Sequence, residues 1–299
     1  MNAFPGPMQA WPSLAEFGQQ IRLARSGINL FLYDSGPSAK PTMILFHGLG
    51  DDADSWRHVF VPLTEKFRVI ALDFPGFGRS DKSRRKYSFA LLRDTVLELM
   101  DQLALPTVVL MGNSLGAMLA ELVAIERPEK VSKLILLDGS LTTRLLSYHK
   151  ALIKMALPIL GPRIYAKLHG QPEVAYQNLR LFFVNLDDLP EADRRFLYER
   201  VNQRVWDDNQ RYAYFSILRQ LIWCIPFRRR HFMSRLIRLG IPTLLIWGQQ
   251  DAVNSIETAK ALVAALPAVQ LKVIPEVGHL PQQEAPHAFL SVLHETANG

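Results

Sequence analysis

The sequence of 299 residues contains a single cysteine, Cys224. One thiol cannot form a disulfide bond within the chain, and because Cys224 lies in an apolar run we expect it to be buried and unreactive. No stretch reaches about 18 uninterrupted apolar residues, which argues against a transmembrane helix. Residues 1–16 lack a basic segment followed by an apolar one, so we expect no secretory signal peptide and predict a cytoplasmic protein.

The sequence also lacks internal repeats and low-complexity segments. Hydrophobic residues make up 48% of the chain, which is enough for a large core. The net charge of +6 would suit a nucleic acid partner, but no nucleic-acid-binding motif accompanies it. We therefore expect no nucleic acid partner.

Apolar runs of strand length alternate with amphipathic helical patterns through the first 140 residues. Helices are expected over residues 56–65 and 89–103, the second with apolar residues at spacings of three and four. Alternation of this kind indicates an α/β fold, in which helices cover both faces of a mostly parallel central sheet. The expected strands comprise residues 22–25, 29–33, 42–46, 67–72, 108–111 and 131–137.

This alternation stops after residue 139. Helical patterns without a convincing strand extend from residue 141 to 239, and strands resume at residues 242–247 and 269–274. We therefore predict an N-terminal core part (1–140), an inserted helical lid (141–239) and a C-terminal core part (240–299). The lid helices are rich in apolar residues, which either pack the lid onto the core or form a pocket for a substrate with an apolar portion.

A candidate nucleophile lies between the strand ending at residue 111 and the next helical pattern. Residues 112–116 read Gly-Asn-Ser-Leu-Gly and match G-x-S-x-G, the nucleophile elbow, in the strand–turn–helix setting where this motif has its meaning. Small neighbours permit a tight turn that exposes Ser114 with a strained backbone. A serine hydroxyl is a weak nucleophile at neutral pH and needs an adjacent base.

The base and its acid are expected downstream, each at the carboxyl end of a strand. His279 follows the last expected strand in a Gly-His turn, and we predict that it is the base. Asp251 follows the strand that ends at Trp247, while Asp138 holds the equivalent place one strand earlier. Either carboxylate can orient an imidazole. We favour Asp251, because Gly248 makes room for its loop.

Acyl chemistry further requires N–H donors for the oxyanion. The residue after the nucleophile supplies the N–H of Leu115. The second donor is expected from the loop after an early strand, where His-Gly-Leu-Gly at residues 47–50 makes the N–H of Leu49 the best candidate.

Taken together, these motifs resemble the α/β-hydrolase superfamily. The chain is similar in particular to its lidded branch, which includes epoxide hydrolases, haloalkane dehalogenases, meta-cleavage product hydrolases, and small esterases and lipases. The resemblance extends from about residue 21 to 293, and its motifs are residues 47–50, 73–80, 112–116, 247–251 and 278–279 followed by 284–286. Epoxide hydrolases and dehalogenases of this branch use an aspartate at the elbow, so Ser114 argues against both reactions.

What the resemblance implies is a serine hydrolase that cleaves a carboxylic ester, without a metal or organic cofactor. One alternative is a carbon–carbon bond hydrolase of a vinylogous diketone, in which Arg79 or a lid arginine would bind the substrate carboxylate. Another is a ligand receptor on the same scaffold. The apolar and basic segment at residues 221–238 suits an anionic membrane surface, the phosphates of a coenzyme A thioester, or simply solvent.

Overall fold

The computed structural model describes residues 6–144, 148–266 and 269–297. An eight-stranded sheet in the order β1-β2-β4-β3-β5-β6-β7-β8 forms its centre. The pairs β1·β2 and β2·β4 are antiparallel and all others are parallel, which confirms the predicted α/β fold. The strands are β1 (Gly18–Arg22), β2 (Asn29–Asp34), β3 (Thr42–Phe46), β4 (Arg68–Leu72), β5 (Val108–Asn113), β6 (Val131–Leu137), β7 (Thr243–Gly248) and β8 (Val269–Ile274).

Two local predictions were wrong near the N-terminus. The strand expected at residues 22–25 instead ends at Arg22, because the chain turns from Leu23 onward, with Leu23 N donating to Ile28 O at 2.8 Å. Gly27, at φ 68°, permits the turn. The helix expected at residues 56–65 is instead the 3₁₀ turn η2 (Ala53–Trp56) followed by the short helix α1 (Phe60–Leu63).

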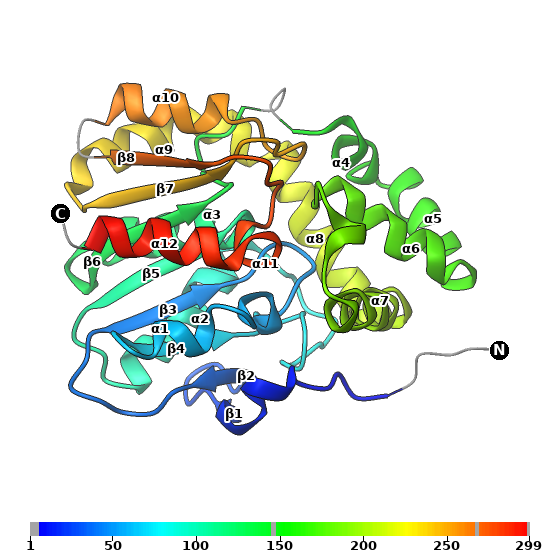
Figure 1. Ribbon diagram of the computed structural model, residues 1–299, viewed down its shortest axis with the longest axis horizontal. Coiled ribbons are helices and arrows are strands. Elements are labelled where there is room, and N and C mark those ends of the chain that lie inside the picture. The colour runs from blue at the N-terminus through cyan, green and yellow to red at the C-terminus, as the bar shows by residue number, and fades with distance from the viewer. Residues whose placement is uncertain (1–5, 145–147, 267–268, 298–299) are drawn as a thin grey trace.

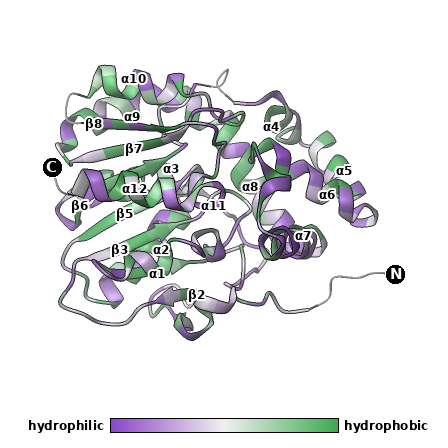
Figure 2. Ribbon diagram, viewed as in Figure 1, coloured by the Kyte–Doolittle hydropathy of each residue, from purple (hydrophilic) through white to green (hydrophobic). Residues whose placement is uncertain are grey.

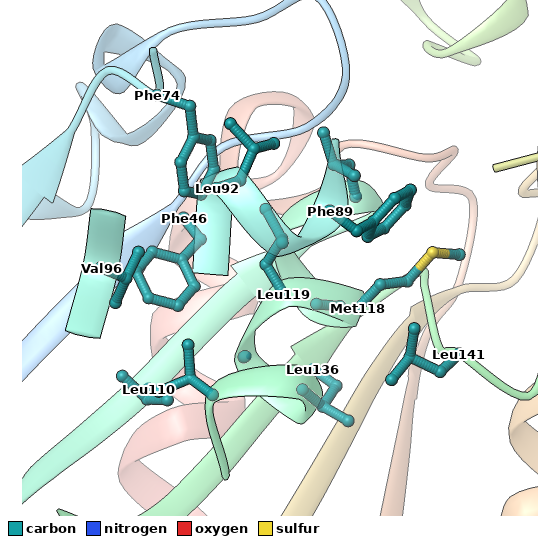
Figure 3. Packing of buried hydrophobic residues seen from close by; sticks show 14 of the residues in the cluster. Phe46, Phe74, Phe89, Leu92, Val96, Leu110, Met118, Leu119, Leu136 and Leu141 are labelled. Carbon is teal, nitrogen blue, oxygen red and sulfur yellow. The ribbon is translucent and has the colours of Figure 1, made fainter. Parts of the chain in front are cut away.

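Helices cover both faces of the sheet, as the alternation predicted (Figure 1). On one face pack α2 (Phe89–Gln102), α3 (Leu115–Glu126) and α10 (Glu257–Ala265). On the other face pack α1 and α12 (Pro286–Ala297). Figure 3 shows the first of these layers, in which Leu92 of α2 and Leu119 of α3 pack with Phe46 of β3. The helix that follows the nucleophile elbow is therefore embedded in the core.

Between β6 and β7 lies a segment that we call the helical region, residues 148–239. No strand occurs among its residues; a single isolated bridge joins Tyr148 to Asn254. Helices α4 to α8 gather beside the carboxyl ends of the parallel strands, and α9 returns to pack against α3 (Figure 1). Its α-helices are α4 (Lys150–Met155), α5 (Leu160–Lys167), α6 (Pro172–Gln177), α7 (Glu191–Trp206), α8 (Asp208–Trp223) and α9 (Ile225–Leu239).

Hydropathy separates these parts clearly. The central strands are hydrophobic, whereas α7 is largely hydrophilic (Figure 2). Cys224 is exposed, contrary to expectation, because it ends α8 at the corner before α9, while its neighbours Ile222 and Ile225 point inward. No helix in the described ranges is both long and apolar enough to cross a membrane.

Candidate active site

Ser114 occupies the sharp turn between β5 and α3. Its backbone lies at φ 55° and ψ −112°, a conformation that costs a non-glycine residue free energy. The Ser114 N–H donates to Leu137 O of β6 at 2.8 Å, which fixes the turn against the neighbouring strand. Gly116 must be a glycine, because a Cβ there would lie 2.1 Å from the Phe46 carbonyl oxygen. A Cβ on Gly112 would lie 2.2 Å from Gly116 C.

His279 and Asp251 are brought together by the loops after β8 and β7. His279 Nδ1 lies 2.8 Å from Asp251 Oδ2, and the two side chains are 3% and 0% exposed. Asp251 Oδ1 accepts from the N–H groups of Val253 at 2.7 Å and Asn254 at 3.0 Å. When His279 Nδ1–H donates to Asp251 Oδ2, the neutral imidazole keeps a lone pair on Nε2 and can accept a proton there.

Asp138, the alternative acid, lies beside Asp251, and the hydrogen bond to the imidazole is made by Asp251. Asp138 Oδ1 accepts from Gly248 N at 2.9 Å. Burial, and then the charge of Asp251, raise the pKa of Asp138 well above its ordinary value. Ionisation of Asp138 beside Asp251 is therefore disfavoured. These two carboxyl groups and His279 offer atoms within 4.8 Å of one another. Within this set the imidazole of His279 binds Asp251, and Asp138 binds the backbone at Gly248.

The loop at residues 47–50 lies against the elbow. A Cβ on Gly48 would be 3.7 Å from the Ser114 Cβ. Within the described part of the chain, the N–H groups of Leu49 and Leu115 donate to no acceptor, so both are available to a ligand. His47 fixes the loop: Nδ1–H donates to Gly48 O at 2.7 Å, and Nε2 accepts from Phe74 N at 3.1 Å. Burial lowers the pKa of His47, which keeps the ring neutral and suited to both roles.

Two residues near His279 escaped the sequence analysis. Asn113 Nδ2 donates to His279 O at 2.9 Å and so joins the elbow to the histidine loop. The Glu284 carboxylate accepts from Gly278 N with Oε2 and from Val184 N with Oε1, both at 2.7 Å. Asn113 is one of the two variable positions of the elbow motif, and Glu284 stands in a motif that was noted but given no role.

Further hydrogen bonds near His279 join the helical region to the core. His279 N donates to Phe182 O at 2.8 Å, and Glu284 Oε1 also accepts from Asn185 N at 2.7 Å. The loop at residues 182–185 is therefore fixed to the loop that carries His279.

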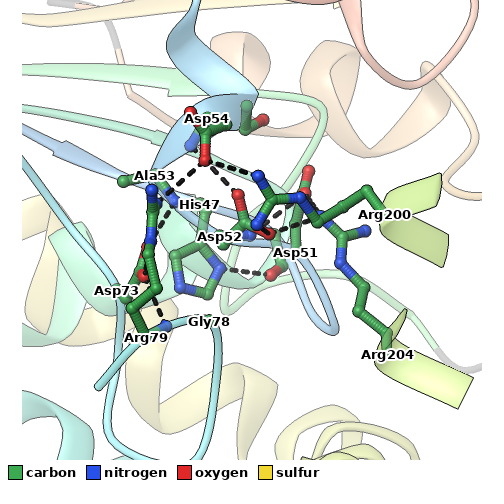
Figure 4. Close-up of polar contacts among 12 residues, drawn as sticks. His47, Asp51, Asp52, Ala53, Asp54, Asp73, Gly78, Arg79, Arg200 and Arg204 are labelled. Carbon is green, nitrogen blue, oxygen red and sulfur yellow. Dashed lines mark hydrogen bonds and ion pairs between the residues drawn. The ribbon is translucent and has the colours of Figure 1, made fainter. Parts of the chain in front are cut away.

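A buried cluster of charges joins α7 to the loop after β3 (Figure 4). Arg200 pairs with Asp54 at 3.0 Å and with Asp52 at 3.5 Å, and Arg204 pairs with Asp52 at 2.8 Å and with Asp51. Burial alone would raise the pKa of Asp52, but Arg200 and Arg204 hold it well below its ordinary value. Asp52 therefore stays ionised beneath α7.

Arg79 belongs to this cluster and does not line the cavity beside Ser114. It pairs with Asp73 and with Asp54, each at 2.9 Å. The suggestion that Arg79 binds a substrate carboxylate is therefore wrong. Asp73 has a structural role, since it also accepts from Ala53 N at 2.6 Å.

A cavity of about 640 Å³ opens above Ser114 and His279. The core supplies its floor and the helical region supplies most of its walls, which are predominantly apolar. Its apolar lining includes Met118, Leu152, Met155, Ile164, Leu168, Leu179, Val205, Leu218 and Leu221.

Comparison with known proteins matches nearly the whole chain. A family model described as alpha/beta hydrolase fold matches residues 41–286. A 2-hydroxy-6-oxononadienedioate/2-hydroxy-6-oxononatrienedioate hydrolase of Pseudomonas putida is 27% identical over 277 residues, covering 90% of this chain and 92% of the relative. The structure of a putative lipase from Acinetobacter baumannii superposes with a TM-score of 0.75 at 25% identity, covering 94% of this chain and 92% of the lipase. A membrane phospholipase A described as a bacterial virulence factor gives a TM-score of 0.71 at 25% identity, covering 94% and 86%.

Proposed function

Because the chain belongs to the alpha/beta hydrolase fold family, we propose that it is a serine hydrolase that cleaves carboxylic esters through an acyl-enzyme. His279 Nε2 takes the Ser114 proton as the serine oxygen attacks the ester carbonyl carbon. Asp251 orients the imidazole and stabilises its positive charge. The N–H groups of Leu49 and Leu115 donate to the carbonyl oxygen as it becomes an oxyanion.

Collapse of this tetrahedral intermediate expels the alcohol, which receives its proton from His279. Water then attacks the acyl-enzyme while His279 again acts as base, and the carboxylic acid leaves with Ser114 restored. No step requires a metal or an organic cofactor.

The observation that carries this proposal is that Ser114, with its strained backbone, lines the same apolar cavity as His279, whose imidazole is bound by Asp251. An apolar cavity of about 640 Å³ suits an acyl chain. We further propose that the helical region serves as a lid over the site, since it supplies most of the cavity walls. Exclusion of water by such a lid strengthens the hydrogen bonds to the oxyanion.

Carbon–carbon cleavage of a vinylogous diketone is the second candidate, because of the similarity to the Pseudomonas putida hydrolase. That reaction needs a cation for the substrate carboxylate. The two arginines of the cavity lining are already paired, Arg204 with Asp51 and Asp52, and Arg180 with Asp187 at 2.5 Å, which leaves Lys154 as the cation that would take this role. Ester hydrolysis needs no such cation, and the predominantly apolar walls of the cavity favour it.

Chromogenic esters from acetyl to palmitoyl, together with labelling by a fluorophosphonate, test the proposal. We expect repeated turnover and a single label on Ser114, both abolished in Ser114→Ala. Ser216→Ala is the matched control, because the Ser216 hydroxyl donates to Tyr212 O at 2.8 Å within α8 and does not line the cavity. Asp251→Asn should lower kcat by about 10⁴ through the wrong imidazole tautomer.

Labelling without ester turnover would favour the second candidate, and a vinylogous diketone is then the substrate to assay. The absence of both labelling and turnover would contradict the proposal that the protein is a serine hydrolase. Labelling of Ser114→Ala as strong as of the wild type would show that another residue is the nucleophile.

A further inference from the structure

Acidic residues are absent from two long stretches of the chain. Residues 139–172 and 209–250 contain no aspartate or glutamate, yet they hold twelve of the 34 lysine and arginine residues. The remainder holds 22 basic residues and all 28 acidic ones, so it is net negative although the whole protein is net positive. Such a separation of charge favours the attraction of one part of the protein to an anionic surface.

The two acid-free stretches meet in the helical region. The first contains α4 and α5, and the second contains most of α8 and all of α9. Near the end of α8, Arg219 donates to Pro158 O and the Trp223 indole donates to Ala156 O, each at 3.4 Å. The turn between α4 and α5 therefore lies beside the junction of α8 with α9.

Large apolar side chains are exposed at this junction. Phe227 is 76% exposed and Ile159 is 66% exposed. Grouped apolar side chains of this kind mark interaction sites, whereas scattered ones need no explanation. We call the group the apolar patch; its members are Leu157, Ile159, Leu160, Trp223 and Phe227. Arg228 and Arg230 are exposed directly after it, on a helix without any acidic residue.

The helices that carry the patch also line the cavity above Ser114. Met155 of α4 and Leu221 of α8 face the cavity, close in sequence to Leu157 and Trp223 of the patch. Lys154 and Ile164 line the cavity and are themselves exposed, so they lie where it opens to the surface. A surface that contacts the patch would therefore lie next to this opening.

We propose that the apolar patch, with Arg228 and Arg230, docks the protein on the surface of an anionic lipid bilayer. Phosphate headgroups attract the arginines, and the aliphatic and aromatic side chains insert among the acyl chains. A nucleic acid offers the same phosphates but nothing for Ile159 or Leu160 to enter. Docking stands independently of the reaction. The corollary, that the ester is an amphiphile drawn from the lipid layer, rests on the proposed function.

Vesicle flotation tests the docking directly. The full chain carrying Ser114→Ala, which consumes no lipid, is mixed with vesicles of phosphatidylcholine alone or of phosphatidylcholine with phosphatidylglycerol. We expect flotation with the anionic vesicles at low salt and weaker flotation at high salt, because salt screens the headgroup charge. Neutral vesicles should bind it far less.

Variants in this background locate the surface. The pair Arg228→Glu and Arg230→Glu should weaken partitioning by about 30-fold or more, since each basic residue near the bilayer contributes roughly fivefold. The pair Ile159→Glu and Phe227→Glu should weaken it by roughly tenfold or more. Val263→Glu on α10 and Arg195→Glu on α7 are matched controls at exposed positions outside the acid-free stretches, and should bind like the parent.

Docking is overturned if the parent fails to float with anionic vesicles at low salt, or if the control variants lose as much binding as the patch variants. Binding to a DNA duplex with none to vesicles would overturn it as well. Hydrolysis of a water-soluble acetyl ester, measured on variants with Ser114 intact, separates the two proposals. Vesicle binding without ester hydrolysis would contradict the proposed function and leave the docking proposal standing. Normal ester hydrolysis by folded patch variants that no longer bind vesicles would show that docking is separate from the reaction.

Discussion

Two sides of the helical region attach to the rest of the molecule in opposite ways. Helix α7 carries charges of both signs and buries Arg200 and Arg204 against aspartates of the core loop (Figure 4). The turn between α4 and α5, in a stretch without acidic residues, leaves Ile159 and Leu160 exposed. The α7 side is held by ion pairs with other residues of the chain, whereas the α4–α5 side presents apolar side chains to the solvent.

Burying an ion pair does not by itself make a protein more stable, because desolvation offsets the attraction. The cluster beneath α7 fixes the position of this helix on the core, because each buried charge must remain next to its partner. Glu284 supplements it by joining the loop at residues 182–185 to the histidine loop. The walls of the cavity near α7 are thereby fixed relative to His279, whereas the α4–α5 turn is held by long hydrogen bonds from Arg219 to Pro158 O and from Trp223 to Ala156 O.

The largest effect on stability is expected from breaking this buried cluster. Arg200 is 2% exposed, and Arg200→Ala would leave Asp52 and Asp54 without one of their cations. We expect the free energy of unfolding to fall by about 3–5 kcal/mol, measured by urea denaturation. Arg195→Ala, which breaks only the exposed pair with Glu199, should change it by about 0.5 kcal/mol or less. Equal losses in both variants would contradict an anchoring role for α7.

Glu284→Ala should reduce catalysis more than stability. Three N–H groups lose their acceptor, and the loop carrying His279 is then free to shift. We expect kcat for an ester to fall by about 10–100-fold with a smaller change in KM, because misplacement of the base affects the reacting geometry. Glu284→Gln, which keeps one acceptor oxygen, should recover part of the rate. Glu257→Ala, at an exposed site on α10, is the control. An unchanged kcat in Glu284→Ala would remove Glu284 as a positioning residue.

A pH effect is expected where the chain leaves the sheet for α4. Glu121 of α3 accepts from Leu141 N and from Ser140 Oγ at 2.8 Å, and burial raises its pKa to about 8. A carboxyl whose pKa is higher in the folded state stabilises the fold below its unfolded pKa of about 4.3, and this contribution is lost as the pH rises through 8. The slope is about 1.4 kcal/mol per pH unit for one proton.

Glu121→Gln should therefore unfold with a free energy that depends less on pH between about 5 and 8 than that of the wild type. Denaturation at several pH values measures this difference. Because both side chains are neutral near pH 4, the two proteins should be about equally stable there, and the variant should be the more stable of the two at pH 7. A difference between the two proteins that does not change with pH would contradict the raised pKa.

The sequence predicts those elements and candidate residues that are marked by patterns of neighbouring residues. The strand, the elbow and the helix around Ser114 are consecutive, and Asp251 and His279 each follow an apolar run. What it missed depends on pairing between distant positions. Arg200 lies 146 residues from Asp54, and Glu284 lies 100 residues from Val184, so no periodic pattern connects them. Cys224 was misplaced for a related reason, because an apolar run does not show where one helix ends and the next turns away.

The smallest effect on stability is expected at the other side of the helical region. Phe227→Ala should change the free energy of unfolding by about 0.5 kcal/mol or less, because its side chain is already exposed. Leu221→Ala, six residues earlier near the end of α8 and 3% exposed, should cost about 2–5 kcal/mol through lost burial and the cavity it leaves. Urea denaturation of both variants measures the contrast. A cost at Phe227 equal to that at Leu221 would mean that Phe227 serves the fold. A negligible cost, together with lost vesicle binding, would mean that this large aromatic side chain serves a partner outside the chain, in contrast to the arginines of α7.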